Sequence, residues 1–159
     1  MTNKNYKGLM ASLKEELHEK FLQIAQQRVI ELEHIIKETQ HAANNETKSS
    51  AGDKHETGRA MAQLETEKLN AQLGEALKLT ELLFKINPKE THQLIGLGSL
   101  VITNNGNFFI SASLGKVLHN DETYYAISSV SPIGKKLIEL KPTDHFFLNE
   151  RKYIINKIN

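Results

Sequence analysis

The chain contains no cysteine among its 159 residues. This absence excludes disulfide bonds, thiolate metal sites and cysteine nucleophiles. No stretch approaches the roughly 18 apolar residues of a membrane-spanning helix, and the first residues lack the apolar core of a signal peptide. We therefore expect a cytoplasmic protein that contacts no membrane and forms one ordinary domain or two small ones.

An excess of charge of one sign is also missing. The 20 lysine and arginine side chains oppose 19 carboxylates, which leaves a net charge of +1 at pH 7. This is too little for a protein that binds nucleic acid by phosphate neutralisation alone. Walker-type phosphate loops, dinucleotide-binding glycine motifs, HExxH and GxSxG are absent from the sequence as well. We therefore expect no independent enzyme, and a partner recognised by its shape is favoured.

Proline is absent before Pro88, and apolar residues in the first half recur at steps of three or four. The two apolar series are Leu13, Leu17, Phe21, Ile24, Leu32, Ile35 and Ile36, and then Leu69, Leu73, Ala76, Thr80 and Leu83. A polar segment over residues 41–52 separates them and ends in a glycine. The pattern predicts an antiparallel coiled-coil hairpin over residues 1–88, with a first helix over about residues 6–43 and a tip over about residues 41–56.

Helices this polar are expected to bury little except each other. Periodicity alone leaves two interpretations open. One is a coiled-coil spacer or dimerisation arm, and the other is a probe that carries a functional group at its tip.

The second half is richer in aromatics and predicts a small β-sheet domain over residues 89–159. Two apolar runs flank Asn104-Asn105-Gly106, a pattern typical of a β-hairpin. Further strands are predicted at residues 123–127, 145–148 and 152–155. Ser131-Pro132 begins a short helix, in which Lys135 and Lys136 are expected to be exposed. The fold class is therefore α+β, a helical hairpin followed by a mostly antiparallel sheet with one short helix.

Asp53 and Glu56 are the candidate site residues. Their spacing of three places both carboxylates on one side of a helix, where they can share a Mg²⁺ ion. The same residues match a capping box, which stabilises a helix start without any other role. Both interpretations stay open, and they are compatible.

The order of these parts resembles the Gre family of bacterial transcript-cleavage factors. The resemblance is carried by Gly52-Asp53-x-x-Glu56 and by the segment Ser131-Pro132-Ile133-Gly134-Lys135-Lys136-Leu137. Residues 95–101 and 153–158 also follow the family pattern. The similarity is good over about residues 94–159 and moderate over 52–85, and over residues 1–51 it depends on helical character.

The resemblance implies an FKBP-like sheet domain that docks on the rim of the secondary channel of RNA polymerase, while the hairpin enters the channel. Asp53 and Glu56 would then help hold the second catalytic Mg²⁺, which is shared with the polymerase, and stimulate cleavage of backtracked RNA. The chain would act as a monomeric accessory factor without a cofactor of its own, and it would meet the RNA end only indirectly.

The tip departs from the family pattern at Lys54, His55 and Thr57, where leucine, serine and asparagine are usual, and its loop is longer. Two alternatives therefore stay open, a secondary-channel regulator without cleavage activity and a coiled-coil adaptor unrelated to polymerase. A prolyl isomerase is disfavoured because the aromatics form adjacent pairs, such as Phe108-Phe109, which point to opposite faces of a strand.

Overall fold

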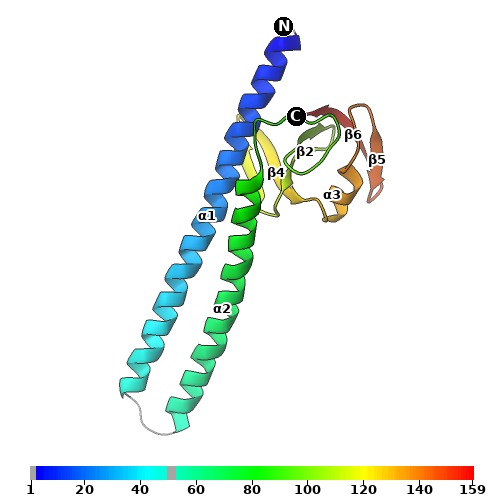
Figure 1. Ribbon diagram of the computed structural model, residues 1–159. Coiled ribbons are helices and arrows are strands. Elements are labelled where there is room, and N and C mark those ends of the chain that lie inside the picture. Colours follow the sequence, from blue (N-terminus) through cyan, green and yellow to red (C-terminus); the bar gives the residue numbers. More distant parts are fainter. Residues whose placement is uncertain (1–2, 50–52) are drawn as a thin grey trace. The chain divides into compact units, whose positions relative to one another are not determined.

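A computed structural model describes residues 3–49 and 53–159, with side chains over residues 7–45 and 56–159. Its elements are α1 (Asn3–Ser49), α2 (Asp53–Lys85), β1 (Leu100–Thr103), β2 (Gly106–Ser111), β3 (Gly115–His119), β4 (Glu122–Ser128), α3 (Pro132–Leu137), β5 (His145–Leu148) and β6 (Arg151–Ile158) (Figure 1). The predicted α+β class is confirmed. Across the described residues, no helix has a stretch long and apolar enough to cross a membrane.

The first helix is longer than predicted, because α1 continues to Ser49 rather than ending near residue 43. The segment over residues 41–49 is polar, but it contains neither proline nor glycine. Polar residues reduce helix stability by only a few tenths of a kcal/mol each, so polarity alone does not end a helix. The predicted loop over residues 41–52 is therefore wrong for residues 41–49, which are helical, and residues 50–52 lie outside the described part of the chain.

The chain divides into two compact units. We name residues 25–80 the hairpin unit, and residues 1–24 with 81–159 the sheet unit. The sheet unit is therefore built from two separate stretches of the sequence.

In the hairpin unit, α1 and α2 run antiparallel beside each other (Figure 1). The buried side chains of this unit are Ala25, Ile36, Leu69, Ala76 and Thr80. All of them except Ala25 belong to the apolar stripe that the sequence predicted. One predicted member of the stripe is not buried. Ile35 is 44% exposed. Because a helix turns by about 100° per residue, Ile36 occupies the seam and its neighbour Ile35 points away from it.

The sheet unit holds a six-stranded sheet in the order β3-β4-β2-β1-β6-β5. The predicted β1–β2 hairpin is confirmed, with Thr103 opposite Gly106 across the Asn104-Asn105 turn. All pairings are antiparallel except β2 with β4, which is parallel. The chain makes this parallel pair by passing from β2 through β3, a strand that the sequence did not predict. Its residues GKVLH contain too little apolar alternation to reveal a strand.

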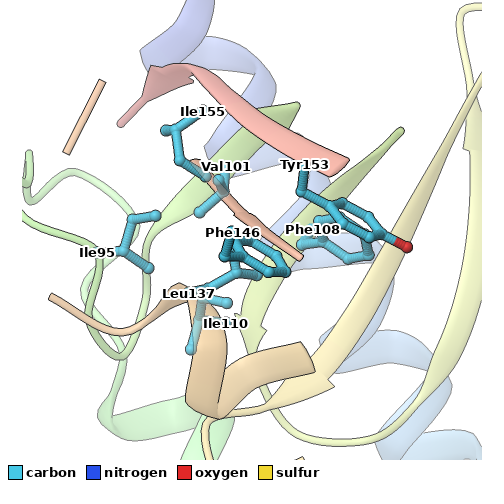
Figure 2. Close-up of a cluster of buried hydrophobic side chains, with 8 residues drawn as sticks. All are labelled: Ile95, Val101, Phe108, Ile110, Leu137, Phe146, Tyr153 and Ile155. Carbon is cyan, nitrogen blue, oxygen red and sulfur yellow. The ribbon is translucent and has the colours of Figure 1, made fainter. Parts of the chain in front are cut away.

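Both faces of the central sheet are buried. On one face, Phe108 and Leu137 belong to a hydrophobic cluster in which Phe146 stacks on Tyr153 at 4.8 Å between ring centroids (Figure 2). On the other face, Phe109 stacks on Phe21 of α1 at 6.0 Å. The expectation that the helices bury little except each other is therefore wrong for residues up to 24, because this part of α1 covers a sheet face.

Candidate functional site

The two candidate site residues lie at the start of α2. The helix begins at Asp53, whose side chain lies outside the described residues. Glu56 lies in the first turn of the helix, and its side chain is exposed. The choice between a helix cap and a metal ligand therefore stays a prediction. On a helix, residues three apart bring their Cβ atoms to within about 5–6 Å, close enough for two carboxylates to share one cation.

The chemistry of this pair suits a shared metal site better than a self-contained one. Mg²⁺ requires six oxygen ligands in near-octahedral geometry, and proteins usually supply one or two carboxylates while phosphates and water supply the rest. Among the described residues, no group of three or more histidine, aspartate or glutamate side chains is placed to hold a metal. A Mg²⁺ site built on Asp53 and Glu56 would therefore need further oxygen ligands, such as phosphates and water.

The hairpin beside this site is polar. A shallow groove between α1 and α2 is lined by Gln40, Ala43, Asn44, Arg59, Ala62, Gln63, Thr66 and Glu67. Gln63 donates a hydrogen bond to Glu67 at 3.4 Å, and Thr66 donates to the carbonyl of Ala62 at 2.9 Å. These side chains bury little apolar surface, so this end of the hairpin is suited to a wet, polar environment.

The SPIG segment has a structural explanation. Ser131 caps α3, because its Oγ accepts a hydrogen bond from the Gly134 N–H at 3.1 Å and donates to the Ser128 carbonyl at 2.7 Å. A Cβ at Gly134 would overlap that same carbonyl oxygen. Leu137 is fully buried in the core beneath the helix. The segment therefore fixes the turn into α3.

Lys135 and Lys136 are exposed on α3, as the sequence predicted. Pro132 is also exposed, at the start of the helix where its missing N–H is not needed. Val130, just before the cap, is 71% exposed.

One buried polar residue was not predicted. Lys14 of α1 is fully buried in the sheet unit, and its Nζ donates to the Glu90 carbonyl at 2.6 Å. The same Nζ lies 3.3 Å from Nδ1 of His92. Burial lowers the pKa of Lys14 to about 8, partly opposed by the charge of Glu90. The sequence did hold a signal, because Lys14 precedes Leu17 and Phe21 at the spacing of the buried stripe.

A second polar cluster also joins α1 to the sheet. The His119 side chain is 9% exposed, and its Nε2 lies 2.9 Å from a carboxylate oxygen of Glu16. Nearby, the Tyr124 hydroxyl donates to Glu122 at 3.0 Å. Burial, together with that hydrogen bond and the charge of Glu122, raises the pKa of Tyr124 to about 12. The contact between Glu16 and His119 joins α1 to the sheet, whereas the hydrogen bond from Tyr124 to Glu122 lies within β4.

The adjacent aromatics separate to opposite faces, as expected. Phe108 lies 6.4 Å from the ring of Tyr153, whereas Phe109 packs on Phe21. In the other pairs, Tyr125 is 39% exposed beside a buried Tyr124 and Phe147 is 59% exposed beside a buried Phe146. The aromatic side chains are thus divided between the hydrophobic cluster around Phe108, the contact of Phe109 with α1, and the protein surface.

Comparison with known proteins adds no family assignment. No protein-family model matches the chain, and no curated protein matches its sequence. The functional argument therefore rests on the chain's own residues and fold.

Proposed function

We propose that this chain is a Gre-like transcription elongation factor that binds bacterial RNA polymerase and stimulates cleavage of backtracked RNA. The sheet unit would supply an FKBP-like domain that docks at the secondary channel. The helical hairpin would enter the channel, and the polymerase itself would perform the hydrolysis.

The observation that carries this proposal is the position of Asp53 and Glu56 in the chain. Both lie in the first turn of α2, which begins four residues after the end of α1 at Ser49. A pair of helices, each about 10–12 Å across, is slender enough to present two carboxylates to a site buried inside another protein. Most residues of the hairpin unit are polar or charged, which suits a water-filled channel, although large apolar side chains such as Met61 and Leu64 are also exposed.

The chemistry of phosphodiester hydrolysis favours these residue types. A divalent metal that holds phosphate oxygens activates water and neutralises the developing charge. Aspartate and glutamate side chains carry a negative charge at neutral pH, so Asp53 and Glu56 would help hold such an ion. Lys54 and His55 lie between them in the sequence, and the positive charge of Lys54, together with that of His55 when it is protonated, would weaken the attraction for a cation.

The carboxyl-terminal segment that carries the resemblance, residues 131–137, offers independent support. Ser131 caps α3, Gly134 leaves room for the Ser128 carbonyl, and Leu137 is buried in the core. The sequence pattern predicted a short helix at this segment, and α3 is that helix. We assign it to the FKBP-like domain that the resemblance implies.

Cleavage by a purified, backtracked elongation complex tests the proposal. We expect the wild-type protein to accelerate release of the RNA 3′ fragment, and Asp53→Asn or Glu56→Gln to abolish the acceleration. Both variants should keep their affinity for polymerase, because each preserves size and hydrogen bonding while removing a charge. Asp53→Asn should also leave stability unchanged, since asparagine caps a helix about as well as aspartate. Glu65→Gln, another exposed position on α2, is the matched control and should cleave like the wild type.

Two other results would favour the alternatives. A wild-type protein that binds polymerase without accelerating cleavage would be a secondary-channel regulator. A protein that does not bind polymerase would remove both polymerase functions and leave the coiled-coil adaptor.

A further inference from the structure

A hollow of about 670 Å³ lies in the sheet unit. It is formed where the start of α1, the segment after α2 and the end of β6 meet, and these contribute Lys7, His92 and Lys157 to its lining. All three belong to one compact unit, so the sheet unit forms the hollow by itself. A volume of several hundred Å³ is typical of a site for a small molecule.

The charged side chains that line the hollow are positive. Lys7 and Lys157 are exposed and line it, and no aspartate or glutamate lies among its described lining residues. Lys14 adds a third cation nearby, because its Nζ lies 3.3 Å from Nδ1 of His92, which is a lining residue. Glu90 is the carboxylate whose charge acts on Lys14 and His92, and it does not line the hollow. An anion is therefore the complementary ligand.

The wall of the hollow also holds a buried polar side chain, that of Asn159. Asn159 is 7% exposed, and within the described part of the chain its Nδ2 atom makes no hydrogen bond. Its backbone is fixed, because Asn159 and Leu100 exchange two backbone hydrogen bonds of 2.9 Å each. An unpaired buried donor is costly, and the last torsion of an asparagine side chain is broad. The amide can therefore turn toward an acceptor oxygen that enters the hollow.

The residue types of the lining indicate which anion fits. Arginine, whose planar guanidinium matches a carboxylate, is absent from the described lining, and both cations there are lysines. Lysine binds a phosphate group as a point charge. Gln93 and Asn156 add amide groups, whereas Met10, Pro142 and Ile158 add apolar surface. A phosphate group bonded to a less polar remainder suits this combination of side chains.

We propose that this hollow binds a small organic phosphate, whose phosphate group is held by Lys7, Lys157 and the Asn159 amide. The apolar part of the lining would contact the rest of the molecule. Such a site belongs to the sheet unit alone, so it goes beyond the proposed function and does not depend on it. A strand of nucleic acid fits less well, because two lysines neutralise few phosphates.

Calorimetric titration of the full-length protein tests the site, with adenosine 5′-monophosphate, glucose 6-phosphate and glycerol 3-phosphate as probes. We expect at least one of these phosphates to bind, and Lys7→Gln and Lys157→Gln each to raise its Kd about fivefold or more. Asn159→Ala should weaken binding as well, because it removes the buried donor. Lys116→Gln is the matched control, since Lys116 is an exposed lysine of β3 outside the hollow, and it should bind like the wild type. Thermal melts of each variant verify folding.

Four results would overturn the phosphate site. The first is that none of the three phosphates binds at millimolar concentration. The second is binding that neither Lys7→Gln nor Lys157→Gln weakens, which would place the ligand elsewhere. The third is that adenosine or citrate binds as tightly as the phosphates, because recognition would then not depend on a phosphate group. The fourth is a short single-stranded RNA that binds more tightly than every probe and loses affinity in the same variants, which would assign the two lysines to nucleic acid.

Discussion

Lys14 is a lysine held away from water at the contact between α1 and the segment that follows α2. Its ammonium group is hydrogen-bonded to the Glu90 carbonyl, and His92 is its other near neighbour. The pKa of His92 is lowered by burial and by the positive charge of Lys14. Because burial lowers its pKa, Lys14 loses its proton at a lower pH in the folded protein than in the unfolded chain.

The lowered pKa of Lys14 predicts that the free energy of unfolding increases as the pH rises. Between the folded pKa of about 8 and the ordinary value of 10.5, the unfolded chain holds a proton that the folded chain has lost. Raising the pH through this window therefore stabilises the fold. We expect the Lys14 contribution to the free energy of unfolding to increase by about 2 kcal/mol from pH 7.5 to pH 9.5.

Urea denaturation at several pH values, with Lys14→Met measured in parallel, isolates the contribution of Lys14. Lys14→Met also removes the charge that lowers the pKa of His92, but His92 loses its proton below pH 7.5, so above that pH the difference between the two curves reports Lys14. Parallel curves over this range would contradict the prediction.

Gly134 makes a second prediction at the scale of one residue. A methyl group there would collide with the Ser128 carbonyl and crowd the Ser131 hydroxyl. We expect Gly134→Ala to lower the free energy of unfolding by about 1–3 kcal/mol, as overpacking does. Gly8→Ala is the control, because Gly8 lies within α1 with no atom near its missing Cβ. It should raise stability by up to about 1 kcal/mol through helix propensity. If Gly134→Ala and the wild type were equally stable in chemical denaturation, the close approach of Gly134 to the Ser128 carbonyl would be absent.

At the scale of the element, the first part of α1 behaves as a member of the sheet unit. Phe21 is fully buried on Phe109, whereas Phe84 near the end of α2 is 62% exposed. We expect Phe21→Ala to cost about 3–5 kcal/mol, and Phe84→Ala to change stability by less than about 0.5 kcal/mol. Denaturation followed by tyrosine fluorescence measures both, because all tyrosines other than Tyr6 lie in the sheet region. A small loss for Phe21→Ala would mean that α1 does not cover the sheet.

The elements also show where sequence patterns are informative. Long segments with apolar steps of three or four predicted two helices, since each extra turn repeats the signal. The segment Asn104-Asn105-Gly106 predicted the β1–β2 hairpin because asparagine and glycine are frequent between paired strands. In the structure the turn residues are Asn104 and Asn105, and the residue with a positive φ is Gly106, the first residue of β2. In contrast, β3 is a strand through its pairing with β4, and its own residues carry almost no pattern.

At the scale of the whole molecule, the discontinuity of the sheet unit predicts how the chain can be divided. A fragment of residues 89–159 lacks the part of α1 that covers Phe109, and it also lacks Leu17 and Leu83, which are fully buried. Residues 1–24 joined to 81–159 by a short Gly-Ser linker keep these contacts, and His18 lies 2.8 Å from the Leu83 carbonyl where the two stretches meet.

We expect the linked protein to melt cooperatively, and the 89–159 fragment to melt at a lower temperature or to aggregate through its uncovered apolar face. Calorimetry of the two proteins compares them directly. A fragment as stable as the linked protein would show that residues 89–159 are self-sufficient, the division that the sequence predicted.

The sequence by itself determined the class of the fold, the two helices, the central hairpin of the sheet and the exposure of Lys135 and Lys136. These features depend on local periodicity and turn chemistry, which neighbouring residues encode. Only the tertiary structure decided that Lys14 is buried, that β2 and β4 pair in parallel and that α1 covers Phe109. These features depend on contacts between residues far apart in the chain, and no local pattern specifies which distant partner a side chain meets. Asp53 and Glu56 belong to the first group, because their spacing is local.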